Sequence, residues 1–129
     1  MIVVDTSAWI ANIRNQAIRA VEQIRDPVVE EQILIGDIVV AEVLQGARDD
    51  RDAARLERDL RRFPIVTMGG EDIAIQAARH YRLMRASGFT PKLPDLFIGS
   101  FCIAHGHELL QSDTDFEPMA KICGLRLLR

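Results

Sequence analysis

Residues 95–116 read DLFIGSFCIAHGHELLQSDTDF, a segment in which acidic residues flank two apolar stretches. Asp95 begins the first stretch, whose apolar residues predict a helix that runs to about His105. The second stretch, ELLQ at 108–111, predicts a strand, and Asp113 and Asp115 follow it. A helix that leaves one edge of a sheet and a strand that returns to that edge would bring Asp95 and Asp113 together, with apolar core between them.

The rest of the chain also alternates between short apolar strands and helices. Strands are predicted at 2–4, 33–35, 64–67 and 125–128. Helices are predicted from the Asp5-Thr6-Ser7 start to a break near Asn15 and on to about Arg25, and then over 38–46, 50–63, 71–86 and 116–123. This alternation indicates an α/β protein with one domain over residues 1–129. The expected architecture is a three-layer α/β/α fold around a central parallel sheet of about five strands.

Bulk composition excludes several classes of protein. The chain has 129 residues, 48% hydrophobic and 27% charged, which suits a globular core rather than a disordered chain. No apolar run approaches the ~20 residues of a membrane helix, and the start MIVVDTSAWI lacks the features of a secretory signal. The two cysteines, Cys102 and Cys123, are expected to be buried hydrophobic residues, which fits a cytoplasmic protein. The net charge of −3 means that any nucleic acid would have to bind at a local basic surface.

Four of the nineteen acidic residues do not fit a solvated surface. Asp5 directly follows the first strand, Glu42 lies inside the apolar stretch VVAEVL, and Asp95 and Asp113 belong to the segment quoted above. Asp5 and Asp95 could also be helix N-caps, and Asp113 and Asp115 could be turn residues, whereas no capping role applies to Glu42. Ligands of parallel sheets bind at the carboxyl ends of the strands, so these acids should converge there and repel one another. A divalent cation would relieve the repulsion, and an all-oxygen ligand set favours Mg²⁺ or Mn²⁺ over Zn²⁺.

Three blocks of sequence carry a resemblance to a known family. They are MIVVDTSAWI, VVAEVLQG and PDLFIGSFCIAHGHELLQSDTDF, and in this order and spacing they extend over essentially the whole chain. On these blocks the chain resembles the PIN-domain ribonucleases and, more narrowly, the VapC-type toxins of bacterial VapBC toxin–antitoxin systems. The resemblance implies a PIN-like fold and a Mg²⁺- or Mn²⁺-dependent endoribonuclease toxin that hydrolyses phosphodiester bonds in a specific cellular RNA.

The same resemblance assigns roles to individual residues. The family's four catalytic acid positions fall on Asp5, Glu42, Asp95 and Asp113. Asp5, Asp95 and Asp113 are expected to bind the metal directly, and Glu42 either to bind it or to orient the attacking water. Ser7 and Asp115 match residues that contact the metal ligands and do not themselves bind the metal. Whether one or two ions bind stays open.

Two further features of the quoted segment bear on this site. Many relatives carry Thr where this chain has Gln111, so a hydroxyl contact is expected to be missing or supplied by Ser112. His105 and His107 form an H-x-H pattern across Gly106, but a turn is predicted there and a metal role is not expected.

The surfaces that bind substrate and partners are less sharply predicted. Five arginines recur every three or four residues, on the side of a predicted helix opposite its apolar face: Arg48, Arg51, Arg55, Arg58 and Arg62. They form either a solvated surface or a phosphate-binding stripe, and Arg82 or Arg85 of the next helix is the better candidate for RNA contact. The resemblance implies a VapB-like antitoxin and a homodimer. Trp9, Ile10 and Ile13 are candidates for an exposed apolar groove, or for ordinary core packing.

Two alternative functions are a receiver-like domain and a non-catalytic binding module with an acidic pocket. A receiver would need paired acids after the first strand, a phosphorylatable Asp after the third and a Lys after a late strand. Here Asp5 stands alone, the third strand ends in VTMGG, and Lys121 lies in a predicted helix. The complete acid set disfavours a non-catalytic module. The sequence does not identify the RNA or its cleavage site.

Overall fold

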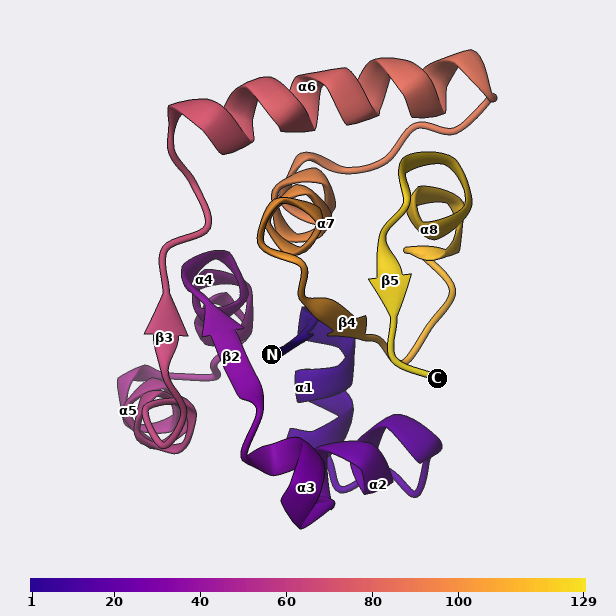
Figure 1. The fold of residues 1–129 in the computed structure, drawn as a ribbon. Coiled ribbons are helices and arrows are strands. Elements are labelled where there is room, and N and C mark those ends of the chain that lie inside the picture. The colour runs from indigo at the N-terminus through magenta and orange to yellow at the C-terminus, as the bar shows by residue number, and fades with distance from the viewer.

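The computed structural model describes all residues, Met1–Arg129, and contains five strands and eight helices (Figure 1). The strands are β1 (Ile2–Val4), β2 (Ile33–Gly36), β3 (Ile65–Val66), β4 (Glu108–Leu110) and β5 (Arg126–Leu127). The helices are α1 (Thr6–Ile13), α2 (Arg19–Arg25), α3 (Pro27–Glu30), α4 (Asp37–Gln45), α5 (Asp50–Leu60), α6 (Glu71–Ala86), α7 (Leu93–His105) and α8 (Glu117–Cys123). Every predicted strand and helix is present, but α3 was not predicted, and α5 ends three residues earlier than the sequence indicated.

All neighbouring strands are parallel, in the order β3-β2-β1-β4-β5, so the predicted five-stranded parallel sheet is confirmed. The chain builds outward from β1 to β3 and then returns to the other side of β1 with β4, which makes the boundary between β1 and β4 the point where strand order reverses. Val4 lies opposite Leu110 in the register, and the amide of Asp5 donates to the carbonyl of Leu110 at 3.0 Å. The residue after β1 and the loop after β4 therefore begin side by side.

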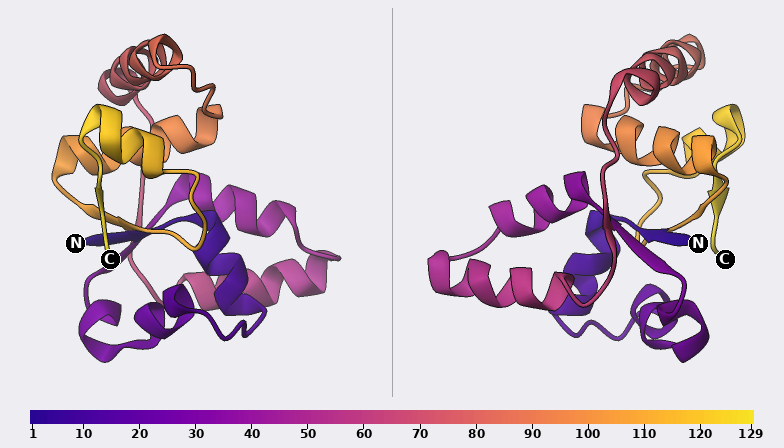
Figure 2. Two further views of the ribbon diagram at one scale, coloured as in Figure 1. Left: turned by 90° about the vertical axis from the view of Figure 1, so that its right-hand side faces the viewer. Right: turned by 60° about the vertical axis from the view of Figure 1, so that its left-hand side comes forward.

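The helices cover both faces of the sheet, as the alternation of strands and helices predicted. Figure 2 shows two groups, with α1–α5 on one side and α6–α8 on the other. In the first group α1 packs on α2 and α4, and α4 packs on α5; in the second, α6 packs on α7 and α8. No helix is both long enough and apolar enough to cross a membrane.

The core consists of the apolar strands and the helix faces turned toward them. Val3, Val4 and Ile35 are completely buried, because a central parallel strand is covered on both faces. Cys102 is also buried, as predicted, but Cys123 is only half-buried, so that prediction was wrong. Cys123 is the last residue of the short helix α8, where the chain turns through the left-handed Gly124 and leaves the side chain partly open.

Gly36, at the end of β2, is expected to be intolerant of even one added methyl group. A Cβ atom at this position would overlap the buried side chain of Met68. We expect Gly36→Ala to lower the free energy of unfolding by about 1–3 kcal/mol, the usual cost of overpacking a core. Gly69→Ala is the matched control, because a Cβ atom there meets nothing within 4 Å. Urea unfolding curves compare the two variants, and equal stabilities would mean that Met68 moves aside without cost.

Candidate active site

Asp5 is the buried centre of the acidic site. It directly follows β1 and caps α1, with its carboxylate accepting the amide of Ala8 at 3.0 Å and the hydroxyl of Ser7 at 2.8 and 2.9 Å. Only 3% of the residue is exposed. Burial raises the pKa of Asp5 to about 7 even though these hydrogen bonds oppose the shift, and the negative charges of Asp113 and Asp95 add to it. Asp5 is thus both the predicted N-cap and a member of the predicted acid cluster.

Glu42 reaches the site from α4, on the same face of the sheet as α1. It is half-buried, and its Oε1 atom accepts the hydroxyl of Thr6 at 2.7 Å. Thr6 was not predicted as a site residue, because the sequence shows it only as part of a helix start. Its role depends on the packing of α1 against α4, which brings together residues 36 positions apart.

Asp95 enters from the opposite group of helices, in the first turn of α7. It is half-buried, and burial is the main reason that its pKa rises to about 6. The negative charges of Glu42, Asp115 and Asp113 raise it further, while Lys92 lowers it. Asp95 therefore lies within electrostatic range of acids from α4 and from the loop after β4.

The loop after β4 carries the remaining two acids, Asp113 and Asp115, both exposed. The amide of Asp115 donates to Asp113 at 3.0 Å, so Asp113 also has the turn-forming role that the sequence left open. The amide of Ser112 approaches the Ser7 hydroxyl oxygen at 3.4 Å and connects the loop to the start of α1. Asp113 lies close enough to Asp95 for its negative charge to contribute to the raised pKa of Asp95.

The side chain of Gln111 forms hydrogen bonds at the end of this loop. Its side-chain oxygen accepts the amide of Phe116 at 3.1 Å, and its side-chain nitrogen donates to Glu117 at 3.4 Å. The amide group therefore closes the loop onto the start of α8. The contact that Ser112 makes toward the site comes from its backbone amide, whereas the prediction considered its hydroxyl group.

The acids share one edge of the sheet without forming a closed ligand set. No group of three or more His, Cys, Asp or Glu side chains is placed to hold a metal ion. The chemistry of the donors nevertheless suits a hard divalent cation, because all are carboxylates. Burial, with a smaller contribution from neighbouring negative charge, raises the pKa of both Asp5 and Asp95. Binding an ion would therefore require these side chains to draw inward, and it would favour their ionised forms.

Several other predicted candidates lie away from the acids. His105 and His107 stack with their ring centroids 5.9 Å apart beside Phe101, at the end of α7 opposite Asp95. Arg82 lines an apolar groove between α6 and α7, and Arg85 donates to the Thr90 hydroxyl at 3.2 Å. Contact between either arginine and RNA stays a prediction.

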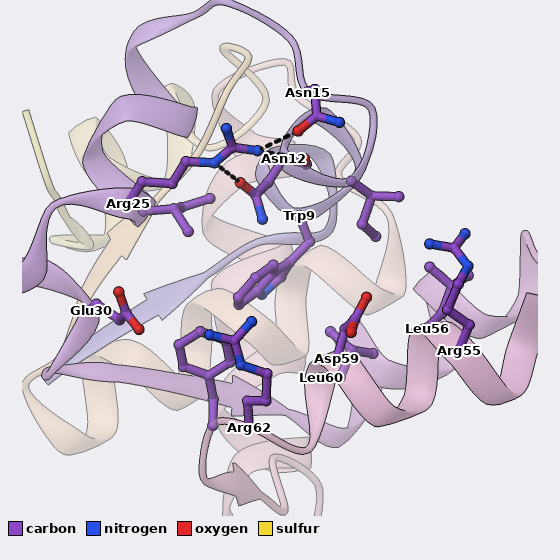
Figure 3. Close-up of a pocket in the computed structure, with 13 residues that line it drawn as sticks. Trp9, Asn12, Asn15, Arg25, Glu30, Arg55, Leu56, Asp59, Leu60 and Arg62 are labelled. Carbon is purple, nitrogen blue, oxygen red and sulfur yellow. Dashed lines mark hydrogen bonds between the residues drawn. The ribbon is translucent and has the colours of Figure 1, made fainter.

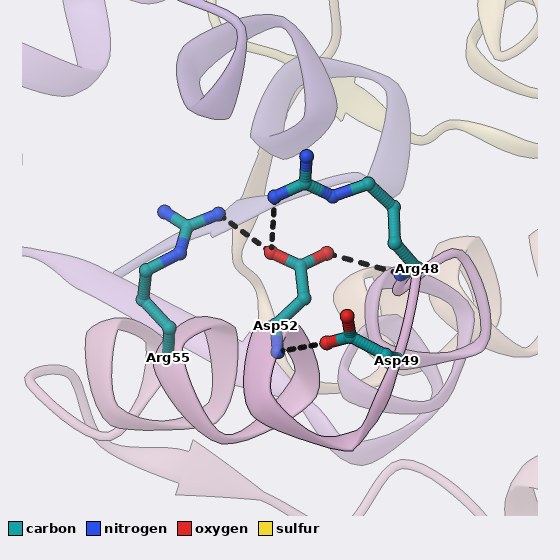
Figure 4. A network of polar contacts seen from close by, with 4 residues as sticks. All are labelled: Arg48, Asp49, Asp52 and Arg55. Atoms are coloured by element: carbon teal, nitrogen blue, oxygen red, sulfur yellow. Dashed lines mark hydrogen bonds and ion pairs between the residues drawn. The ribbon is translucent and has the colours of Figure 1, made fainter.

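The arginine stripe around α5 is partly neutralised by acids of the same segment. Figure 4 shows Arg48 and Arg55 converging on Asp52, at 3.4 and 2.8 Å. These contacts and the amide of Arg48 hold the pKa of Asp52 well below its usual range. The stripe was expected to lie opposite the apolar face of the helix. This is wrong for Arg62, because the helix ends at Leu60 and the chain then turns. Arg62 and the exposed Arg55 both line a hollow that also contains the apolar residues Leu56 and Leu60 of α5.

Comparison with known proteins agrees with this architecture. The PIN domain model matches residues 2–122. Ribonuclease VapC11 of Mycobacterium tuberculosis and a VapC ribonuclease of Mycobacterium bovis are each 32% identical to this chain over 129 residues, which is 98% of this chain and 96% of theirs.

Two solved structures illustrate the likeness in fold. VapBC2 from Rickettsia felis, bound to a DNA fragment from its promoter, has a TM-score of 0.79 at 20% identity, covering 99% of this chain and 98% of that one. VapC20 of Mycobacterium tuberculosis, a toxin that cleaves the sarcin–ricin loop, has a TM-score of 0.64 at 18% identity, with 91% and 93% covered. With the PIN domain model matching nearly its full length and curated VapC relatives aligned from end to end, this chain belongs to the PIN-domain family, among the VapC ribonucleases.

Proposed function

We propose that this chain is a metal-dependent endoribonuclease toxin of a type II toxin–antitoxin system, acting in the cytoplasm on a specific cellular RNA. The observation that carries the proposal is the presence, at one edge of the sheet, of acids from four separate parts of the chain, with Asp5 and Asp95 buried enough to raise their pKa values. Asp5 follows β1, Glu42 lies in α4, Asp95 opens α7, and Asp113 and Asp115 follow β4. Negative charge concentrated at one sheet edge disfavours folding, and a role in holding a cation accounts for its presence.

Asp5, Asp95 and Asp113 are the proposed metal ligands, and Mg²⁺ or Mn²⁺ is the proposed ion. When bound there, such an ion would lower the pKa of a water molecule and neutralise charge on the phosphate. PIN-domain VapC nucleases generally depend on a divalent metal.

The chain's own contacts determine how these acids are presented. Ser7 and the amide of Ala8 hold the Asp5 carboxylate in one orientation. Thr6 does the same for Glu42, which we propose either binds the ion or orients the attacking water. Asp115 lies beside Asp113 on the loop, where its charge favours cation binding and its amide fixes the Asp113 side chain.

Chelation tests the proposal most directly. We expect purified protein to cleave single-stranded RNA in the presence of Mg²⁺ or Mn²⁺ and to lose this activity in EDTA. Either ion should also raise the melting temperature, because it binds the folded site and relieves its repulsion. A non-catalytic acidic module would show the thermal shift without cleavage, and cleavage that persists after exhaustive dialysis against EDTA would contradict the metal mechanism.

An antitoxin is the proposed partner, and the structure offers a surface that fits one. A hollow of about 410 Å³ lies between α1, α2 and α5, with Trp9, Ile13 and Leu60 among its apolar residues (Figure 3). Arg25 and Arg62 also line it and lie on either side of Trp9 in this view. The indole nitrogen of Trp9 is buried and has no hydrogen-bond partner. Three arginines line the hollow against two acids, Glu30 and Asp59, so a segment with apolar and some acidic side chains would complement it, as expected for a VapB-like antitoxin.

A homodimer is proposed on the opposite face, at the apolar groove of about 620 Å³ between α6 and α7. The exposed side of α6 carries Glu71 in its first turn, Ala78 in the middle and Arg85 in its last turn. Ala78 is midway between the two charged residues. Two copies of α6 packed antiparallel about Ala78 would pair each Glu71 with the Arg85 of the partner, and the small central side chain permits close approach.

A further inference from the structure

Two hollows adjoin the acidic loop, one beside each half of it. The first, of about 460 Å³, is lined by Ser112 and Asp113 together with residues of α2 and the two residues after β5, Leu128 and Arg129. The second, of about 350 Å³, is lined by Thr114 and Asp115 together with Asp95 and the connection between α6 and α7. Four consecutive loop residues therefore form the boundary between the two hollows.

The first hollow contains two exposed arginines, each with a contact to the surrounding chain. Arg19 donates to the backbone carbonyl of Arg129 at 2.8 Å, and Arg129 binds both carboxylate oxygens of Glu117 at 2.7 and 3.1 Å. This pairing lowers the pKa of Glu117, so the glutamate stays charged and keeps Arg129 in place. An arginine has five N–H donors. Both guanidinium groups thus retain donors that can bind a phosphate in a forked geometry.

The second hollow has one cationic group, the ammonium of Lys92. Lys92 is exposed, and it lowers the pKa of Asp95, which shows that its charge acts at the acidic site. The hydroxyl of Thr90 also lines this hollow. An ammonium group beside a hydroxyl suits a phosphate oxygen, although less selectively than the arginines of the first hollow.

We propose that a single RNA strand crosses the acidic loop from one hollow to the other. Arg19 and Arg129 bind its phosphates on one side of the scissile bond, and Lys92 binds a phosphate on the other side. This inference rests on the proposed ribonuclease function and adds the path of the substrate. Such contacts are needed because the chain has a net charge of −3 and its acids repel RNA. With only 5% aromatic residues, base stacking has little part in holding the strand.

Binding of RNA to a protein that cannot cut it tests this path. The Asp5→Asn variant is the background, because Asp5 lines neither hollow. The probe is a fluorescein-labelled, single-stranded oligoribonucleotide of mixed sequence, followed by anisotropy from low to high salt. We expect Arg19→Ala and Lys92→Ala each to weaken binding about tenfold, as for the loss of a hydrogen bond to a charged group. Each should also reduce the slope of log affinity against log salt by about 0.7, the value for one phosphate contact in a single strand.

Arg58→Ala is the matched control, since Arg58 is exposed on α5 and lines neither hollow. Arg19→Lys should recover most of the salt slope, because it restores the charge. Arg19, Lys92 and Arg58 are all exposed, so their substitution should not change the melting temperature of the Asp5→Asn background, and lost binding cannot be attributed to unfolding.

Shortened probes test the direction of the strand. Truncation from one end should remove the effect of Lys92→Ala, and truncation from the other end should remove the effect of Arg19→Ala.

The inference is overturned if Arg58→Ala weakens binding as much as the other two, or if all truncations affect both variants equally. If the unsubstituted protein cleaves RNA while Arg19→Ala and Lys92→Ala bind normally, the path is wrong and the ribonuclease function stands. If the unsubstituted protein binds RNA in this way without cleaving it, the function fails and the path stands.

Discussion

Asp5→Asn is expected to abolish RNA cleavage while making the metal-free protein more stable at neutral pH. The substitution removes a charge that is only 3% exposed and is repelled by Asp113 and Asp95. An asparagine can still accept the amide of Ala8, so the cap of α1 survives. Cleavage should fall about a thousandfold, the scale on which removal of one electrostatic group slows an enzyme.

The stability effect has a definite dependence on pH. The pKa of Asp5 rises from 3.8 in the unfolded chain to about 7 in the folded one, so the folded state holds the proton more tightly. The stabilisation is complete below about pH 4 and is lost as the pH rises through about 7. Asp95 adds a smaller effect of the same sign that ends near pH 6. In EDTA, the melting temperature should therefore fall between pH 5 and pH 8, and the fall should be much smaller in Asp5→Asn.

Thermal melts in EDTA over this pH range, run beside an RNA cleavage assay, measure both effects. The shift of Asp5 corresponds to roughly 4 kcal/mol as an upper bound. Asp26→Asn is the matched control, because Asp26 is also an aspartate N-cap, of α3, but is exposed. That variant should behave as the unsubstituted protein in both assays. A metal-free Asp5→Asn protein that melts lower than its parent at pH 8 would assign Asp5 a purely structural role.

Much of the fold was predictable because local signals and packing agree. The helix over Glu71–Ala86 has the predicted bounds, with acids in its first turn and an arginine in its last. In contrast, α3 is a single turn of four residues that begins with Pro27, and such a short segment has no apolar period to detect. The early end of α5 at Leu60 was also hidden, because Phe63 continues the apolar period while the backbone has already turned toward β3.

The acidic residues of the candidate site could be predicted from the sequence, but their hydrogen bonds to other side chains could not. Asp5 and Asp113 were predicted to lie at one edge of the sheet because each follows a strand, and in the structure those strands, β1 and β4, are neighbours. The hydrogen bond from Thr6 to Glu42 could not be predicted, because it depends on how α1 and α4 pack across 36 residues of chain. The basic residues that lie near the acids could not be predicted either. Arg82 and Arg85 were favoured by their position along the chain, whereas Arg19 and Lys92 line the hollows beside the acids.

Glu42→Gln is the second substitution with a large expected effect, and it separates a functional acid from a structural one. The Thr6 hydroxyl donates to Glu42 at 2.7 Å, and a glutamine oxygen can accept the same bond. The substitution removes the charge of Glu42, which raises the pKa of Asp95, so it relieves repulsion at the site without opening a cavity. We expect cleavage to fall about a hundredfold or more, the range for loss of a positioned proton acceptor. The metal-free protein should be as stable as its parent or more stable.

Glu57→Gln provides the contrast needed to interpret that result. The Glu57 side chain is 47% exposed and pairs with Arg61 at 2.8 Å within α5. An exposed pair of this kind contributes at most about 1 kcal/mol, so this variant should cleave RNA normally and melt close to its parent. Melts in EDTA and a cleavage assay with Mn²⁺ compare the two glutamine variants under the same conditions. If Glu42→Gln keeps full activity, or if it melts clearly lower than its parent without metal, Glu42 is a structural residue and the proposed metal site consists of the three aspartates alone.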